Sequence, residues 1–81
     1  MDIEFSKHAQ EVIRERHIPE DWVRRTIAQP DRHEAPPDGT MHYIKAIPEH
    51  GERYLRVVIN PAVTPQRVVT VFFDRRLGRR S

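Results

Sequence analysis

Three side chains near the N-terminus, His8, Glu15 and Arg16, have the types and spacing of a small polar site. If this segment is a helix, Arg16 projects between Val12 and Ile13 on its apolar stripe, and the other two lie together at one edge. A guanidinium at the edge of a core needs an acceptor or a ligand, because burying it unpaired is costly. We favour a hydrogen-bonded network that ties helix to sheet. The alternative is a site in which His8 transfers protons near neutral pH.

A second group of candidate residues lies in the C-terminal half, where cations alternate with aromatic residues. Strand alternation places the following residues on one open face of a sheet: Tyr43, Lys45, Tyr54, Arg56, Thr70 and Phe72. Rings of this kind stack nucleic-acid bases, and the cations between them hold phosphates. The same residue types are also ordinary on the solvated face of an antiparallel sheet. In a ribonuclease, Arg56 and Lys45 would bind the scissile phosphate and a tyrosine would stack a base.

The chain has 81 residues, which is enough for one small domain with a single core. It contains no cysteine, so disulfides and thiolate metal sites are excluded, as in many proteins of a reducing compartment. No apolar run approaches the roughly 20 residues of a membrane span. We therefore expect a soluble, cytoplasmic protein with no membrane partner, made of one domain over residues 1–74 and a basic, flexible tail over residues 75–81.

The net charge of +2 is unevenly distributed. Four of the fourteen basic residues lie in the tail, which leaves ten basic against twelve acidic residues in 1–74. Any nucleic-acid surface must therefore be local, or the tail must supply it. Two interpretations of the tail stay open: a solubilising end, or a segment that contacts phosphates through residues such as Arg75.

The five histidines do not form a metal-binding pattern. No His-x-x-x-His or His-Glu-x-x-His spacing occurs, and three glycines are too scattered for a phosphate-binding loop. Ser6 is better explained as a helix cap than as a nucleophile. We predict no metal and no cofactor.

Periodicity and turn residues predict the element order β-α-α-β-β-β. The expected elements are a strand over residues 1–5, helices over 7–17 and from 19 to 28 or 29, a loop over 31–39, and strands over 40–47, 53–60 and 67–74. This order predicts an α+β fold, with a mainly antiparallel sheet and two helices on one face. Apolar alternation assigns to the helix side Leu55, Val57, Ile59, Val69, Val71 and Phe73, together with Ile44 and Ala46.

The chain resembles a family of small bacterial proteins catalogued as a domain of unknown function. The resemblance rests on Phe5-Ser6-Lys7-His8-Ala9, on Glu15-Arg16-His17-Ile18, and on Val69-Thr70-Val71. These match a Phe-Ser-x-His-Ala start, a Glu-Arg-x-Ile helix end and a closing Val-Thr-Val strand. The likeness runs nearly the full length and is most specific over residues 5–30. Many members carry an arginine four residues after the histidine, where this chain has Val12.

The predicted topology is also similar to that of the RelE, ParE and BrnT toxins of bacterial toxin–antitoxin pairs. The RelE-like resemblance implies a cationic sheet face that binds RNA. It also implies cleavage without a metal, by attack of a ribose 2′-hydroxyl on the neighbouring phosphate. Basic residues then stabilise the added charge, and a proton-transfer group assists. Such toxins are neutralised by an antitoxin laid over the active face, so the resemblance also implies an antitoxin partner.

We therefore predict a toxin–antitoxin-type RNA-binding protein, with metal-independent endoribonuclease activity on mRNA or other single-stranded RNA. In this hypothesis the catalytic residues are His8, Lys45 and Arg56, the substrate-binding residues are Tyr43, Tyr54, Thr70 and Arg75, and a structural network contains Glu15 and Arg16. The alternative is a non-catalytic protein- or RNA-binding module.

Overall fold

Eight short elements follow one another along residues 3–77, the part of the chain that the computed structural model describes. In chain order they are β1 (Ile3–Phe5), α1 (Lys7–Glu15), α2 (Glu20–Ala28), β2 (Arg32–Glu34), β3 (Met41–Ile47), the 3₁₀ helix η1 (Pro48–His50), β4 (Arg53–Asn60) and β5 (Gln66–Phe73). Residues 1–2, which begin the first predicted strand, and 78–81 of the predicted tail lie outside the described residues.

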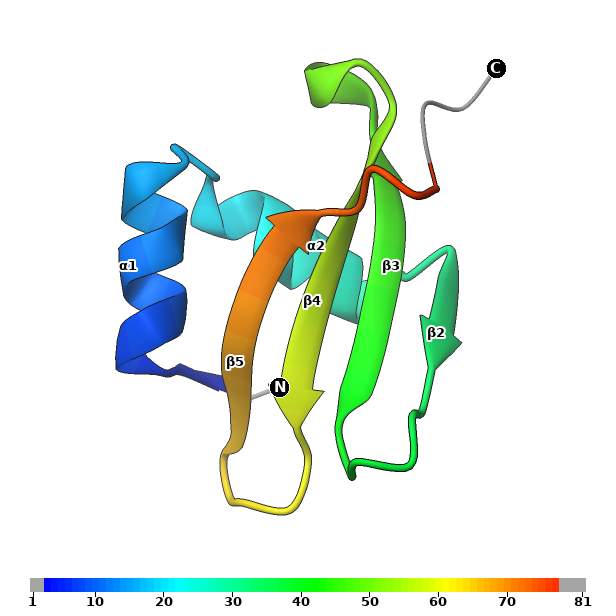
Figure 1. Cartoon of the computed structure of the whole chain (residues 1–81). Helices are drawn as coiled ribbons and strands as arrows, with labels where there is room; N and C mark the ends of the chain where they lie inside the picture. Colours follow the sequence, from blue (N-terminus) through cyan, green and yellow to red (C-terminus); the bar gives the residue numbers. More distant parts are fainter. Residues whose placement is uncertain (1–2, 78–81) are drawn as a thin grey trace.

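The five strands form one sheet in the order β1-β5-β4-β3-β2 (Figure 1). β1 runs parallel to β5, and all other neighbours are antiparallel. The predicted α+β fold with a mainly antiparallel sheet is confirmed. Among the described residues, neither helix is long and apolar enough to cross a membrane.

β2 occupies part of the segment predicted to be a loop, so that prediction is wrong for residues 32–34. The segment is fixed by Asp31, whose backbone N–H donates to the Ile44 carbonyl at 2.8 Å. The Asp31 carboxylate also accepts from the Ala46 N–H at 2.9 Å. These bonds hold the chain against the edge of β3, and the next three residues pair with it.

Ser6 caps α1, as predicted. Its hydroxyl oxygen accepts from the Ala9 N–H at 3.0 Å, and the hydroxyl donates to the Val69 carbonyl at 3.0 Å, so the cap also joins the helix to β5. α1 ends at Glu15, two residues earlier than predicted, because His17 adopts a left-handed backbone with φ of 55°.

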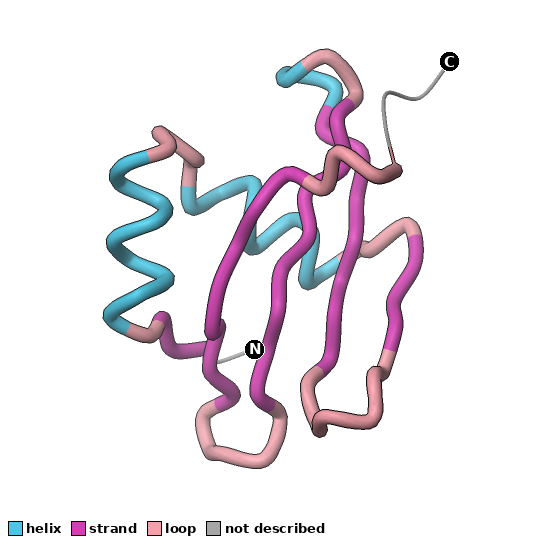
Figure 2. Tube along the Cα trace, in the orientation of Figure 1, coloured by secondary structure: helices cyan, strands magenta, loops and turns pink. Residues whose placement is uncertain are grey.

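Both helices cover the same face of the sheet (Figure 2), with α1 beside β5 and α2 behind β3 and β4. The core between helices and sheet contains Ala9, Ile18, Val23, Ile27, Ile47, Leu55, Val57, Ile59, Val68 and Val71. The predicted inward set on β4 is therefore confirmed.

The face prediction for β3 is wrong by one residue. Tyr43 pairs with Val57 and Lys45 pairs with Leu55, and residues directly opposite in antiparallel strands share a face. Tyr43 and Lys45 therefore lie on the helix side, and Ile44 and Ala46 lie on the open face. Both alternate sets of β3 contain apolar residues, so hydrophobicity alone did not identify the inward one.

β5 contains an irregularity that changes its inward set. Val58 pairs with Thr70, but Ile59 pairs with Val68, so Val69 is the extra residue of a bulge. Val68 is buried in the core in place of Val69, which we had predicted there. Val71 and Phe73 lie on the helix side as predicted.

Candidate functional site

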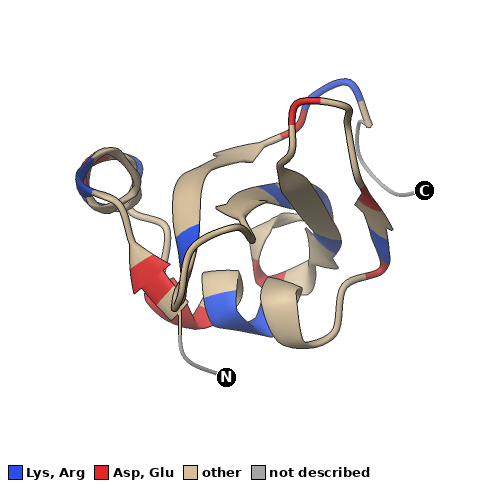
Figure 3. Cartoon of the chain, turned by 90° about the horizontal axis from the view of Figure 1, so that it is seen from below, with Lys and Arg blue, Asp and Glu red and all other residues tan. Residues whose placement is uncertain are grey.

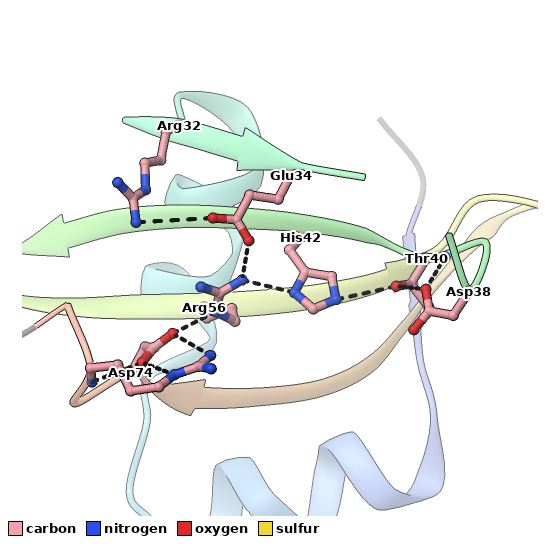
Figure 4. A network of polar contacts seen from close by, with 8 residues as sticks. Arg32, Glu34, Asp38, Thr40, His42, Arg56 and Asp74 are labelled. Atoms are coloured by element: carbon pink, nitrogen blue, oxygen red, sulfur yellow. Dashed lines mark hydrogen bonds and ion pairs between the residues drawn. The ribbon is translucent and has the colours of Figure 1, made fainter. Parts of the chain in front are cut away.

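Arg56 is the centre of a polar network on the open face. It lies on β4 and is only 5% exposed. Its Nε donates to Asp74 Oδ2 at 2.8 Å, and its Nη1 donates to Glu34 Oε1 at 3.0 Å (Figure 4). Nη1 also lies 2.9 Å from Nδ1 of His42. A buried guanidinium is tolerated only with such partners, because its desolvation is costly.

Asp74 follows β5 and is the buried acidic partner, at 4% exposed. Besides Arg56, its carboxylate accepts from Arg76 Nε and Nη2, both at 3.2 Å, and from the Arg76 backbone N–H at 2.9 Å. The hydrogen bonds from Arg76, with the one from Arg56, lower the pKa of Asp74 to about 2, although burial opposes the shift. Asp74 is therefore ionised and bridges two arginines.

Glu34 is the second acidic partner, and it comes from the edge strand β2. Its carboxylate binds Arg56 and lies 4.0 Å from Arg32 Nη2. The hydrogen bond and charge of Arg56 lower the pKa of Glu34 below its usual value. The ion pair crosses over β3 and ties β2 to β4.

His42 continues the network toward the loop before β3. Arginine has no acceptor atom, so Nδ1 of His42 accepts from Arg56 Nη1 in this contact. Nε2 then donates to Thr40 Oγ1 at 3.2 Å, and the Thr40 hydroxyl donates to Asp38 Oδ1 at 2.6 Å. The hydrogen bonds from Thr40 lower the pKa of Asp38. All donors in this chain of hydrogen bonds therefore point from Arg56 toward Asp38.

Two of the residues predicted to lie on the open face are absent from it. Lys45 Nζ donates to the Gln29 carbonyl at 2.9 Å and lies 3.6 Å from Asp31 Oδ1, at the end of α2. Tyr43 packs against the core, with its ring centroid 6.4 Å from that of His33. The prediction that they share a face with Arg56 is wrong.

The remaining sheet residues lie where we predicted. Tyr54, Thr70 and Phe72 are on the open face, because they pair with Ala46, Val58 and Arg56. Phe72 is 38% exposed, and among the described residues it is the large hydrophobic side chain left open to solvent. Arg75 is exposed just beyond β5.

His8, Glu15 and Arg16 do not form the network we predicted. All three are exposed, and within residues 3–77 no hydrogen bond or ion pair joins them. Arg16 is the C-cap of α1, so it does not project onto the apolar stripe of a continuing helix. His8 lies on α1, on the helix-covered side of the sheet.

Sequence reasoning missed His42, Glu34 and Asp74. The available signal was Arg56 itself, because an arginine inside the apolar run of β4 requires a buried acid. Asp74 is the acid at the end of the neighbouring strand, two residues after Phe72 and therefore on the same face. Glu34 had no comparable signal, since it lay in a predicted loop.

Charge is mixed over the described part of the chain. Figure 3 shows acidic and basic segments interspersed around the ribbon. Within residues 3–77, no three His, Asp or Glu side chains converge as metal ligands. The open face therefore offers arginines held in place by carboxylates, the imidazole of His42 and the exposed ring of Phe72.

Comparison with known families identifies the chain. A family described as a domain of unknown function, DUF4258, matches residues 5–73. The chain belongs to this family, which confirms the resemblance found in its sequence. No curated protein and no solved structure matches it significantly.

Proposed function

We propose that this protein is a small cytoplasmic RNA-binding protein of the toxin–antitoxin type, and that the open face of its sheet binds single-stranded RNA. One observation carries the proposal: Phe72 leaves an aromatic ring exposed on the same face as Arg32 and Arg76. A ring stacks on a base of any sequence, and arginines of the same face contact the backbone phosphates. Arg56 is buried beneath the exposed side chains of this face, and it holds its hydrogen-bond partners in place.

Binding of a fluorescent single-stranded RNA oligonucleotide, followed by anisotropy, tests this proposal. Phe72→Leu should weaken binding about tenfold, since stacking on an aromatic ring contributes about 1–3 kcal/mol per base. Phe72→Tyr keeps the ring and should bind like the wild type. Arg14→Gln, an exposed change on α1, is the matched surface control. Equal affinity for all four proteins, or binding of a peptide but not of RNA, would refute the proposal.

A metal-independent endoribonuclease is the second candidate, with His42 in the place we had assigned to His8. The favouring observation is that Nδ1 of His42 lies 2.9 Å from Arg56, since phosphodiester cleavage uses a proton-transfer group beside a cation. Purified protein should then yield RNA fragments ending in 2′,3′-cyclic phosphate, and His42→Gln should not. If the wild type leaves the RNA intact, the ribonuclease activity is refuted and only the RNA-binding function remains.

An antitoxin is the protein partner that this proposal implies. A polypeptide that covers Phe72 should compete with RNA for the open face. The competition should disappear if the partner binds the helix-covered side instead.

A further inference from the structure

We infer that Glu34 occupies an anion-binding site formed by Arg32, Arg56 and Arg76, and that a phosphate group can take its place. For a phosphate that belongs to RNA, the inference rests on the proposed function. The site itself rests only on the polar network of the open face.

Two guanidinium groups contact the Glu34 carboxylate, and a third lies on the far side of Arg56. Arg56 Nη1 lies 3.0 Å from the carboxylate and Arg32 Nη2 lies 4.0 Å from it. Arg76 is held beside Arg56 through Asp74, because Arg76 Nη2 at 3.2 Å and Arg56 Nε at 2.8 Å both bind Asp74 Oδ2. Three cations therefore meet two carboxylates.

The two carboxylates differ in exposure, and this difference identifies the replaceable one. The side chain of Asp74 is 2% exposed, and it holds Arg56 and Arg76 from the buried side of the network. The side chain of Glu34 is 47% exposed, at the edge of the sheet (Figure 4). A carboxylate that moves into water regains its hydration, so Glu34 can leave at low cost while Asp74 cannot.

Phosphate is the ligand that suits the three arginines. The guanidinium fork binds phosphate oxygens through two parallel N–H donors, and three arginines can share the oxygens of one group. Asp74 already holds Arg56 and Arg76 in fixed positions, so little side-chain freedom is lost on binding. The side chain of Arg76 is 80% exposed and can reach an incoming anion.

Titration with inorganic phosphate tests the site without RNA. Side-chain Nε–H signals of the three arginines should shift in NMR spectra of the wild type, against sodium chloride at equal ionic strength. Glu34→Gln should bind phosphate about fivefold or more tightly, because the competing charge is gone. Glu20→Gln is the matched control, since Glu20 pairs with Arg24 at 2.9 Å on α2.

The possible results separate this inference from the proposed function. Equal phosphate affinity in Glu34→Gln and Glu20→Gln would overturn it, as would shifts confined to Arg24 and Arg25. Tighter phosphate binding by Glu34→Gln supports the site even if the protein binds no RNA. RNA binding that depends on Phe72 but is unaltered by Glu34→Gln would overturn the assignment of an RNA phosphate to this site and leave the proposed function standing.

Discussion

Arg56 is the residue whose role in the structure differs most from the role predicted from the sequence. It was predicted to contact phosphate directly, yet it is buried and bound to two carboxylates and an imidazole. Removing one member of a buried ion pair leaves the other charge unpaired, which costs more than the pair contributes. Arg56 is therefore primarily a structural residue, and a ligand can reach its Nη1 only where the exposed Glu34 side chain moves aside.

Replacement of Arg56 should destabilise the fold. We expect Arg56→Ala to lower the free energy of unfolding by about 3–5 kcal/mol, because Asp74 stays buried without its partner. Urea denaturation followed by circular dichroism measures this change. The double variant Arg56→Ala, Asp74→Ala should lose less than the sum of the two single changes. A loss as small as that of Arg14→Gln would contradict the structural role.

Asp74 should make stability depend on acid pH. Its pKa is about 2 in the folded protein, below the ordinary value of 3.8, so its contribution is complete above about pH 4 and is lost as the pH falls toward 2. The contribution is about 2 kcal/mol by the linkage relation. Thermal melts between these pH values should show a shallower decline for Asp74→Asn. The lowered pKa values of Glu34, Asp38 and Glu49 contribute to the decline that remains.

At the scale of elements, local signals predicted the helices and most strands well. Ser6 and Pro19 marked the two helix starts, and apolar alternation identified β4 and β5. The prediction of the inward face of β3 was wrong because the two alternate sets of its side chains are similarly apolar. Only the pairing of β3 with β4 determines which set faces the helices. β2 was not predicted because its pairing depends on the contact between Asp31 and β3, a long-range contact that no local pattern encodes.

The cap of α1 should be a measurable part of the stability. We expect Ser6→Ala to lower the free energy of unfolding by about 1 kcal/mol, because the Ala9 N–H loses its acceptor. Ser6→Asp restores an acceptor but cannot donate to the Val69 carbonyl, so it should recover only part of the loss. Full recovery would show that the bond to β5 contributes nothing.

The structure at the end of α1 reverses the expectation from sequence that Arg16 stabilises the fold. The sequence had indicated a buried charge network there, whose loss would lower the melting temperature. Arg16 is instead exposed beyond the helix, so Arg16→Ala should change stability by no more than about 0.5 kcal/mol. A fall of several degrees in the melting temperature would restore the original prediction.

At the scale of the whole molecule, the sheet has two faces with different roles. The helices bury one face, and the other carries the Arg56 network, Tyr54, Thr70 and Phe72. The sequence was sufficient to predict the fold class, the separation into two faces and four of these residues, Arg56, Tyr54, Thr70 and Phe72. It could not predict the network, because Glu34, His42 and Asp74 are brought together only by the pairing of four strands.

NMR mapping of the bound surface is the strongest test of RNA binding by the open face. In a titration with single-stranded RNA, backbone and side-chain signals should shift at Phe72, Thr70, Glu34 and the neighbouring arginines. The signals of His8, Arg14 and the rest of α1 should stay in place. Shifts confined to the helices, or an unchanged spectrum at saturating RNA, would contradict the claim that the open face of the sheet binds RNA.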